Sequence, residues 1–276
     1  MTDEQRYLFD LNGYLVVRQA LPVDLVARLN AEIDQLNRMG NEEVAVAGAP
    51  RSPEVEDASC NEFTSTLLAY GGVFEELIDV PTTLPLIGEM IGDPLRLDAM
   101  HYMSRVPGNS SRLHHGYAEL LAYSEYAVNR DRFECVSVKI AYALTDVGID
   151  NGPFVVVPGS HKCNFANPDI LQEPTLDTPM IQPFPCRAGD AVLFSEDLTH
   201  GALRNRSDVV RRTIFVSYAP AFHSGWGDQT VTAPGFSDRA TPRQRELIEG
   251  VSPYGAPEET VFSGVAAAAV GAGSGE

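Results

Sequence analysis

Cysteine is scarce in this chain of 276 residues. The four cysteines are scattered, and no two of them form a CxxC pair. Structural zinc sites and disulfide frameworks need cysteines that are closely spaced or numerous. The sequence therefore predicts neither, and it favours a cytoplasmic protein with reduced thiols. The cysteines are Cys60, Cys135, Cys163 and Cys186.

Long apolar segments are also missing. No run approaches the roughly 20 apolar residues that span a bilayer. The first residues, Met1 to Glu4, are acidic and lack the apolar region of a signal peptide. We therefore expect no membrane partner. The last residues, Ser263 to Glu276, are rich in Ala, Gly and Ser and are predicted to form a flexible tail.

Basic residues are outnumbered, with 20 Lys and Arg against 38 Asp and Glu, which gives a formal net charge of −18. Such a charge repels polyanions, so neither a nucleic acid polymer nor an anionic lipid surface is expected as a partner. The charge also keeps a protein soluble. It leaves a small anionic ligand possible, because such a ligand needs only a local basic pocket.

The remaining composition, 44% hydrophobic and 21% charged, is typical of a folded chain. We expect one domain over residues 1–262, with a helical flank (1–94), a core (95–220) and a C-terminal loop and helix (221–262). Short strand-like runs separated by Gly and Pro turn residues fill the core. This pattern favours a mainly β jelly roll with flanking helices, the double-stranded β-helix or cupin-like fold. The predicted strands are Leu97–Val106, Cys135–Leu144, Phe154–Val157, Asp190–Phe194 and Thr213–Tyr218.

The flank predicts a short helix, a turn at Asn12-Gly13 and a strand within Phe9–Val17. Apolar residues at helical spacing predict a helix over Pro22–Leu36. The other expectations are a loop over Asn41–Ser59, one or two short helices over Phe74–Ile91, a helix within Tyr117–Phe133 and a Pro-rich insertion over Asn164–Cys186.

Two histidines and an arginine outline a candidate metal site. His114 opens the triplet His114-His115-Gly116, while His200 and then Arg211 follow two later strand-like runs. Non-haem Fe(II) oxygenases bind iron through two histidines and a carboxylate and leave positions open for cosubstrate and O2. Period-two alternation places Arg211 and Thr213 on one strand face and Arg212 on the other. An inward guanidinium suits the distal carboxylate of a dicarboxylate such as 2-oxoglutarate.

Three motifs carry a resemblance to a known family. They are the opening FDLNGYLVVRQAL (9–21), the string NGPFVVVPGSHK (151–162) and the string from His200-Gly201 through Asn205 and Ser207 to Arg211. The chain resembles the phytanoyl-CoA dioxygenase family of Fe(II)/2-oxoglutarate oxygenases over most of its length. The resemblance implies a double-stranded β-helix, iron held by His114 and His200, and 2-oxoglutarate held by Arg211.

The chain departs from the family at the first ligand. The family pattern is His-x-Asp, whereas Gly116 occupies the position of the aspartate. Three interpretations stay open. Chloride fills the vacant position, as in the His-x-Gly or His-x-Ala halogenases of the superfamily; another oxygen ligand, Glu119 or water, fills it and the enzyme hydroxylates; or the metal site has decayed and the protein is a cupin-like binding protein. Gly116 thereby separates halogenation from hydroxylation, and the sequence favours halogenation, with hydroxylation as the alternative.

The remaining candidates are assigned by position. His114 is favoured over His115 as the ligand, because the family places an apolar or aromatic residue before it and Leu113 fits. His161, in the PGSHK string, is predicted to be structural. The substrate is a small molecule that resembles an amino acid, a nucleotide or a natural product, and the oligomeric state stays open. The other candidates are His101, Lys139 and Thr213 for the cosubstrate, and His115, Arg105, Arg112, Glu119 and Trp226 for the substrate.

Overall fold

A computed structural model describes most of the chain between residues 1 and 249. The described residues are 1–39, 62–63 (backbone only), 67–115, 126–163, 165, 167–171, 174–223 and 231–249. The predicted loop over Asn41–Ser59, most of the predicted helix within Tyr117–Phe133 and the predicted tail lie outside them.

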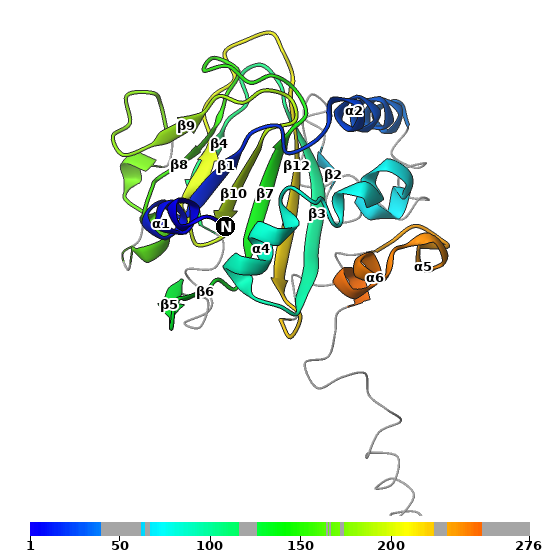
Figure 1. The fold of residues 1–276 in the computed structure, drawn as a ribbon. Coiled ribbons are helices and arrows are strands. Elements are labelled where there is room, and N and C mark those ends of the chain that lie inside the picture. Colours follow the sequence, from blue (N-terminus) through cyan, green and yellow to red (C-terminus); the bar gives the residue numbers. More distant parts are fainter. Residues whose placement is uncertain are drawn as a thin grey trace, which may run out of the picture.

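Two antiparallel sheets form the centre of the molecule, with helices around them (Figure 1). The larger sheet has the strand order β1-β10-β7-β12-β3-β2, and the smaller has the order β4-β11-β8-β9. The mainly β prediction is therefore confirmed at the level of sheets and flanking helices. The strands of the larger sheet are β1 (Tyr14–Val17), β2 (Glu62–Phe63), β3 (Leu95–Arg105), β7 (Val138–Ala143), β10 (Ala191–Ser195) and β12 (Arg211–Pro220); those of the smaller are β4 (Ser111–His114), β8 (Phe154–Val156), β9 (Gln182–Phe184) and β11 (His200–Ala202).

Helices cover the outer face of the larger sheet. In Figure 1, α4 lies across the central strands, while α2, α5 and α6 gather on the β3 side. The predicted helix over Pro22–Leu36 is confirmed as α2. The predicted helices within Phe74–Ile91 correspond to η2 and α4. The helices are α1 (Asp3–Asn12), α2 (Val23–Arg38), α4 (Leu84–Ile91), α5 (Phe236–Arg239) and α6 (Pro242–Glu249), with 3-10 turns η1 (Leu67–Tyr70), η2 (Gly72–Leu77), η3 (Ser160–Lys162) and η4 (Asp169–Leu171).

The predicted turn at Asn12-Gly13 ends α1. Thr2 and Gln5 form a capping box at the start of this helix, and Gly13 ends it with a φ of 81°. The next residues form β1, which pairs with β10 at the edge of the larger sheet. The flank is therefore not only helical, because it supplies an edge strand of the main sheet.

The predicted helix within Tyr117–Phe133 is wrong for its described end. This segment forms the hairpin of β5 (Ala127–Asn129) and β6 (Arg132–Glu134). The two turn residues, Arg130 and Asp131, have φ values of 50° and 63°. Positive φ at both central residues is the geometry of a tight hairpin turn, and it interrupts a helix.

Apolar side chains fill three layers. The largest cluster lies between the helices and the outer face of the larger sheet. A second lies between the two sheets and includes Phe154, Phe194 and Phe215. A third, with Leu113 and Val155, covers the outer face of the smaller sheet. The middle layer is the one that borders the candidate site.

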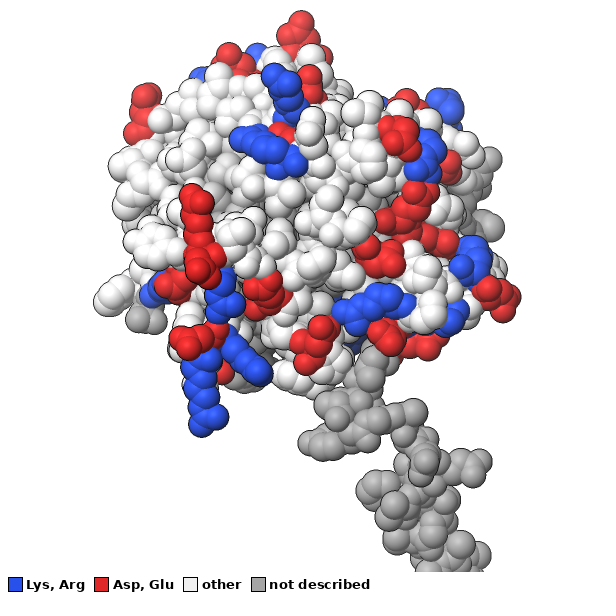
Figure 2. Space-filling view, in the orientation of Figure 1, with Lys and Arg blue, Asp and Glu red and all other residues white. Residues whose placement is uncertain are grey.

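The charged surface is mixed on the face shown in Figure 2, where Lys and Arg lie among Asp and Glu rather than in one basic patch. No helix in the described ranges is long and apolar enough to cross a membrane.

Candidate metal and cosubstrate site

His114 and His200 lie side by side at the edge where the smaller sheet meets the middle apolar layer. They are register partners at the ends of β4 and β11. Their ring centroids are 4.4 Å apart, at an interplanar angle of 52°. His200 is almost completely buried and packs against Phe154 and Phe194, whereas His114 is exposed. Residues 86 positions apart thus present two imidazoles to one point in space.

Both imidazoles are oriented by main-chain carbonyl groups. Nδ1 of His114 lies 3.0 Å from the carbonyl oxygen of Arg112, and Nδ1 of His200 lies 2.7 Å from that of Leu198. Because a carbonyl only accepts, each Nδ1 carries the proton, and each Nε2 keeps a lone pair. Burial lowers the pKa of both histidines, which keeps the rings neutral. Neutral imidazole with Nδ1–H on a carbonyl is the usual form of a metal-ligating histidine.

Gly201 explains why β11 comes so close to β4. A Cβ atom at this position would lie 2.7 Å from the carbonyl oxygen of Arg112 and 2.9 Å from that of Ser111. Only glycine leaves room for such an approach. The register also shifts between His200 and Ala202, as in a β-bulge. In the His200-Gly201 pair, the histidine is the proposed ligand, and the glycine allows its strand to approach β4 closely.

A third ligand is not found among the described residues. No His, Cys, Asp or Glu in that part of the chain joins His114 and His200 in a three-residue group. Gly116 and Glu119, the two positions on which the sequence interpretations depend, lie outside the described residues. The two histidines fit a divalent metal as two of its ligands.

Arg211 opens β12 and is almost completely buried. Its guanidinium donates a hydrogen bond to the carbonyl oxygen of Gly152, in the NGPFVVVPGSHK string. Gly152 has a φ of 65°, and a Cβ there would lie 2.6 Å from the carbonyl oxygen of Leu203. The glycine of one motif therefore packs against the other motif and holds the arginine at the wall of the cavity.

Asn205 links the same two motifs. Its amide nitrogen donates to the carbonyl oxygens of Arg105 and Val209, at 3.0 Å and 2.8 Å. Its amide oxygen accepts from the backbone and hydroxyl of Ser207, whose hydroxyl also accepts from Asn151. These contacts fix the loop that precedes Arg211.

A cavity of about 440 Å³, including its open mouth, lies between the sheets. Arg105 and Arg211 lie at the same register position of β3 and β12, at one end of this cavity. His101 also lines it and stacks on Phe215 at 5.0 Å, and burial lowers the pKa of this histidine to about 3. The lining residues are His101, Met103, Arg105, Ser111, His114, Lys139, Phe154, His200, Gly201, Ala202, Arg211 and Phe215.

Lys139 points into the cavity, and its Nζ binds Oε1 of Glu196 at 2.8 Å. Glu196 was not a candidate from the sequence, although its position four residues before His200 is a signal that alternation could have used. Thr213 is buried on the inward face of β12 but does not line the cavity.

The alternation expected for β3 breaks at Asp98. Strict alternation along this strand would put Leu97 on the same face as His101 and Met103; the latter two line the cavity, but Leu97 belongs to the outer cluster. The register between β3 and β12 explains this, because Ala99 pairs with Ser217 and Leu97 with Tyr218. The intervening Asp98 is the extra residue of a β-bulge.

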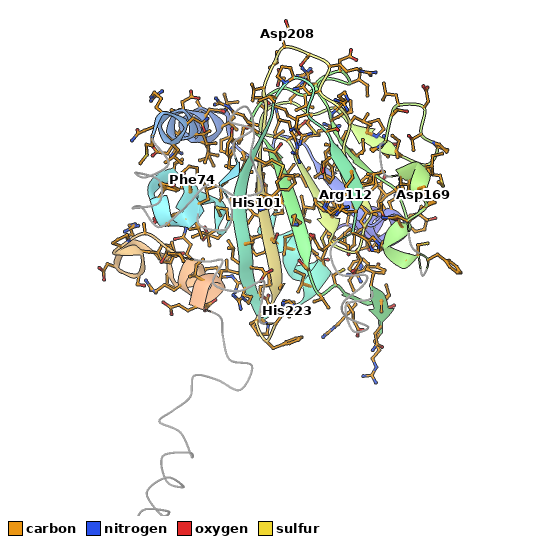
Figure 3. All side chains as sticks on the ribbon, turned by 180° about the vertical axis from the view of Figure 1, so that it is seen from behind. Phe74, His101, Arg112, Asp169, Asp208 and His223 are labelled. Atoms are coloured by element: carbon orange, nitrogen blue, oxygen red, sulfur yellow. The ribbon has the colours of Figure 1, made fainter. Side chains whose placement is uncertain are left out.

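The other substrate candidates are spread over different places. Arg105 lines the cavity, whereas Arg112 is exposed on the smaller sheet (Figure 3). His115 is partly exposed and does not line the cavity. Glu119 and Trp226 lie outside the described residues.

His161 has the contacts of a structural residue, as the sequence predicted. Its Nε2 lies 3.2 Å from the carbonyl oxygen of Asp10, and its ring packs edge-on against Tyr126. It therefore joins η3 to the end of α1, away from the cavity.

Known proteins are similar to this chain over the region that contains the same motifs. The sequence model described as phytanoyl-CoA dioxygenase (PhyH) matches residues 9–213. Dioxygenase trt7 of Aspergillus terreus is 25% identical over 244 residues, which cover 86% of this chain and 80% of that protein. Ectoine dioxygenase of Stutzerimonas stutzeri is 23% identical over 255 residues, which cover 85% of this chain and 80% of that protein.

Among solved structures, the chain is similar to HygX of Streptomyces hygroscopicus, in a crystal structure with nickel, 2-oxoglutarate and hygromycin B bound. The TM-score is 0.69 at 23% identity, and the match covers 84% of this chain and 96% of HygX. At this identity, the likeness establishes a shared fold.

Proposed function

We propose, from the premise that this chain belongs to the phytanoyl-CoA dioxygenase (PhyH) family, that its Fe(II) is held by His114 and His200 and its 2-oxoglutarate by Arg211. It is an Fe(II)/2-oxoglutarate-dependent dioxygenase. The double-stranded β-helix expected from the sequence is the arrangement that we assign to its two sheets. The fold supports the site, and the site carries the functional argument.

One observation carries the proposal. Two neutral imidazoles, each fixed through Nδ1 by a main-chain carbonyl, share a cavity with a buried arginine. When bound, iron supplies the activation of O2 for the oxidation of a C–H bond, while 2-oxoglutarate is converted to succinate and CO2. One oxygen atom enters the succinate, and the other enters the oxidised substrate.

The residues of this chain orient and shield the reactants. Arg211, with Arg105 beside it, offers guanidinium donors to the distal carboxylate of 2-oxoglutarate. Phe154 and Phe194 pack against the His200 ring and keep water from this side of it. Preorganised groups of this kind hold the reactants in one geometry and exclude side reactions.

A small organic molecule is the substrate class that the cavity supports. Its wall combines aromatic side chains, Phe154 and Phe215, with a few convergent polar groups, which is the usual composition of small-molecule sites. The structural relative HygX was crystallised with hygromycin B. Of the three classes expected from the sequence, a nucleotide fits least, because Arg112 is exposed on the smaller sheet and Lys139 is paired with Glu196.

Halogenation is the second candidate, and Gly116 is the observation that favours it. Glycine has no side-chain oxygen to offer the metal, so a chloride ion could take the position of the family's aspartate. The relatives trt7 and ectoine dioxygenase are described as dioxygenases, which favours oxygenation as the first candidate.

Anaerobic reconstitution with Fe(II) and 2-oxoglutarate tests the first proposal. We expect a metal-to-ligand charge-transfer absorption band in the wild type and its loss in His200→Ala and Arg211→Ala. His223→Ala, which leaves the assigned ligands in place, is the control. A wild-type protein without the band, at saturating 2-oxoglutarate, would contradict the proposed cofactors.

Chloride titration of the same complex separates the two candidates. A shift of the band with chloride in the wild type, abolished in Gly116→Asp, supports halogenation. An unchanged band, together with succinate and oxygenated product in chloride-free buffer, supports oxygenation and removes the halogenase candidate.

A further inference from the structure

The cavity has two chemically different ends. Arg211 begins β12, just after the loop that contains Asp208, and His223 follows the end of the same strand. Figure 3 shows Asp208 and His223 at opposite ends of the molecule, with His101 on the strands between them. Arg105 and Arg211 make the first end basic. Toward the second end Lys139 lines the cavity, with Glu196 paired to it from behind and Asp98 on the adjoining part of β3.

Lys139 connects the cavity to this second end. It lines the cavity, and its ion pair with Glu196 places that carboxylate directly behind the wall. Ser217 of β12 is the register partner of Lys139 on β7 and of Ala99 on β3. Asp98, next to Ala99, therefore lies near the level of Lys139, with β12 between them. The charges of Lys139 and Glu196 also influence the pKa of Asp98, as the strand register leads us to expect.

Asp98 is directed inward by the bulge in β3. Met100 and Tyr102 face the outer cluster on one side of the bulge, and Leu97 faces it on the other. Because Leu97 keeps the outer face, the extra residue Asp98 turns toward the face of Lys139. Bulges beside active sites commonly redirect a side chain in this way.

The second end contains acceptors without donors. Asp98 is 1% exposed, and neither of its carboxylate oxygens has a hydrogen-bond partner within the part of the chain that the structure describes. Oε2 of Glu196, which is 5% exposed, also has none. Burying such groups without donors is costly, and burial raises the pKa of Asp98 accordingly. Groups retained at this cost are expected where function requires them.

The charges around these acceptors are balanced. Lys139 and Arg96 both lie within electrostatic range of Asp98, and together they match the two carboxylates in number. The guanidinium of Arg96 donates to the carbonyl oxygen of His223 at 3.1 Å rather than to Asp98. A cationic ligand would upset this balance, whereas a neutral group that donates to the carboxylates and accepts from Lys139 would preserve it.

We propose that Asp98, Glu196 and Lys139 form a subsite for a neutral, hydroxyl-bearing part of the substrate, at the end of the cavity opposite Arg211. Hydroxyl groups both donate and accept, so vicinal hydroxyls match the empty carboxylate oxygens and the ammonium of Lys139. The inference rests on the proposed function, because it assigns this end to the substrate and the Arg211 end to 2-oxoglutarate.

Comparing Asp98 with a second buried aspartate, Asp190, in the metal-free protein tests whether the Asp98 carboxylate lacks hydrogen-bond donors. Asp190 is 3% exposed, like Asp98, but it accepts from the backbone of Gln19 and Arg187 and from Arg18. We expect Asp98→Asn to raise Tm by about 2–4 °C and Asp190→Asn to lower it. A lower Tm for Asp98→Asn would show that the fold itself supplies its donors, and it would overturn the subsite.

Ligand binding tests the substrate class. The probes are myo-inositol, which is neutral and hydroxylated, and the cation of cyclohexylamine, measured by ligand-observed NMR on protein loaded with Ni(II) and 2-oxoglutarate. We expect inositol to bind, at least about tenfold more weakly in Asp98→Asn and Lys139→Met, with Asp190→Asn unchanged. Tighter binding of the cation than of inositol overturns the inference. So does an inositol affinity that is the same in the wild type, Asp98→Asn and Lys139→Met.

The loading step separates the two proposals. If Ni(II) and 2-oxoglutarate bind and the Arg211→Ala variant loses 2-oxoglutarate, the assigned cofactor site stands whatever the probes do. Failure of inositol alone then counts against the hydroxyl subsite. Failure of the loading itself counts against the proposed function.

Discussion

Gly201 and Arg112 make a backbone contact that couples the two proposed iron ligands. A Cβ at Gly201 would lie 2.7 Å from the carbonyl oxygen of Arg112, and the same oxygen accepts from Nδ1 of His114. The residue beside His200 therefore rests against the group that orients His114. A displacement on one strand is transmitted directly to the ligand on the other.

Gly201→Ala is expected to weaken metal binding without unfolding the protein. The new methyl group pushes the Arg112 carbonyl away and turns the His114 ring. Loss of such an outer contact typically lowers metal affinity by about 10–100-fold. Titration with Ni(II) or Co(II) measures the change.

Gly88→Ala is the matched control, because its Cβ would meet only Oδ2 of Asp93 at 3.9 Å. Within α4 this change should add about 0.5–1 kcal/mol of stability and leave metal affinity as it is. Metal affinity that stays equal to the wild type in Gly201→Ala would refute the coupling.

Arg211→Lys is expected to raise the Kd of 2-oxoglutarate by about tenfold or more. Lysine keeps the charge but loses the planar fork and the donor to Gly152. The charge-transfer band of the Fe(II) complex reports binding during a 2-oxoglutarate titration. The control is Arg212→Lys, because Arg212 pairs with Asp34 of α2 on the opposite face. Equal Kd values for the two variants would remove the assigned role of Arg211.

The sequence predicts most of the framework because strong local signals agree with the final packing. Alternation predicts that Arg211 and Arg212 face opposite sides of β12. In the structure Arg211 lines the cavity, and Arg212 donates to Asp34 of α2. The apolar runs predict the main strands within a few residues, as β3 and β12 illustrate. The proposed metal and 2-oxoglutarate residues follow from the family resemblance, which rests on short motifs around His200 and Arg211.

Features that depend on a single irregular residue are not predictable in this way. The bulge at Asp98 shifts the inward face of β3 by one residue, and no alternation rule anticipates it. The turn at Arg130 and Asp131 has positive φ at both residues but contains no glycine or asparagine. The sequence therefore lacks the usual signal of a hairpin, and a helix is predicted instead. Glu196 meets Lys139 across 57 residues of chain, a pairing that only the sheet order creates.

Asn205→Ala is expected to destabilise the protein by about 2 kcal/mol or more. The substitution removes the Asn205 donor to the carbonyl oxygens of Arg105 and Val209 and the acceptor of Ser207; because Asn205 is itself buried, losing such contacts costs about 1–3 kcal/mol. Urea unfolding of the metal-free protein measures the change. The exposed Asn129→Ala, in the β5–β6 hairpin, should change stability by less than about 0.5 kcal/mol. Similar losses in both variants would contradict the role assigned to Asn205.

Stability is expected to fall as pH decreases from about 6.5 to about 4, because His161, in addition to His101, His114 and His200, resists protonation in the folded state. Burial, and then the charge of Lys162, lower the pKa of His161 to about 4 from an ordinary value near 6.5. Between these values the unfolded chain binds the proton and the folded one does not. The stabilisation is therefore complete above about pH 6.5 and is lost on acidification.

Replacement of His161 tests this slope. We expect His161→Gln to show a smaller dependence of the unfolding free energy on pH across this window, measured by urea unfolding at constant ionic strength. Lys162→Met removes the neighbouring positive charge, so the pKa of His161 rises and the window narrows. Asp10 does not confuse the measurement: burial favours its neutral form, but hydrogen bonds from Lys162 and Tyr126 outweigh this and lower its pKa below the window. A slope that is the same in the wild type and in His161→Gln would assign the acid sensitivity to another group.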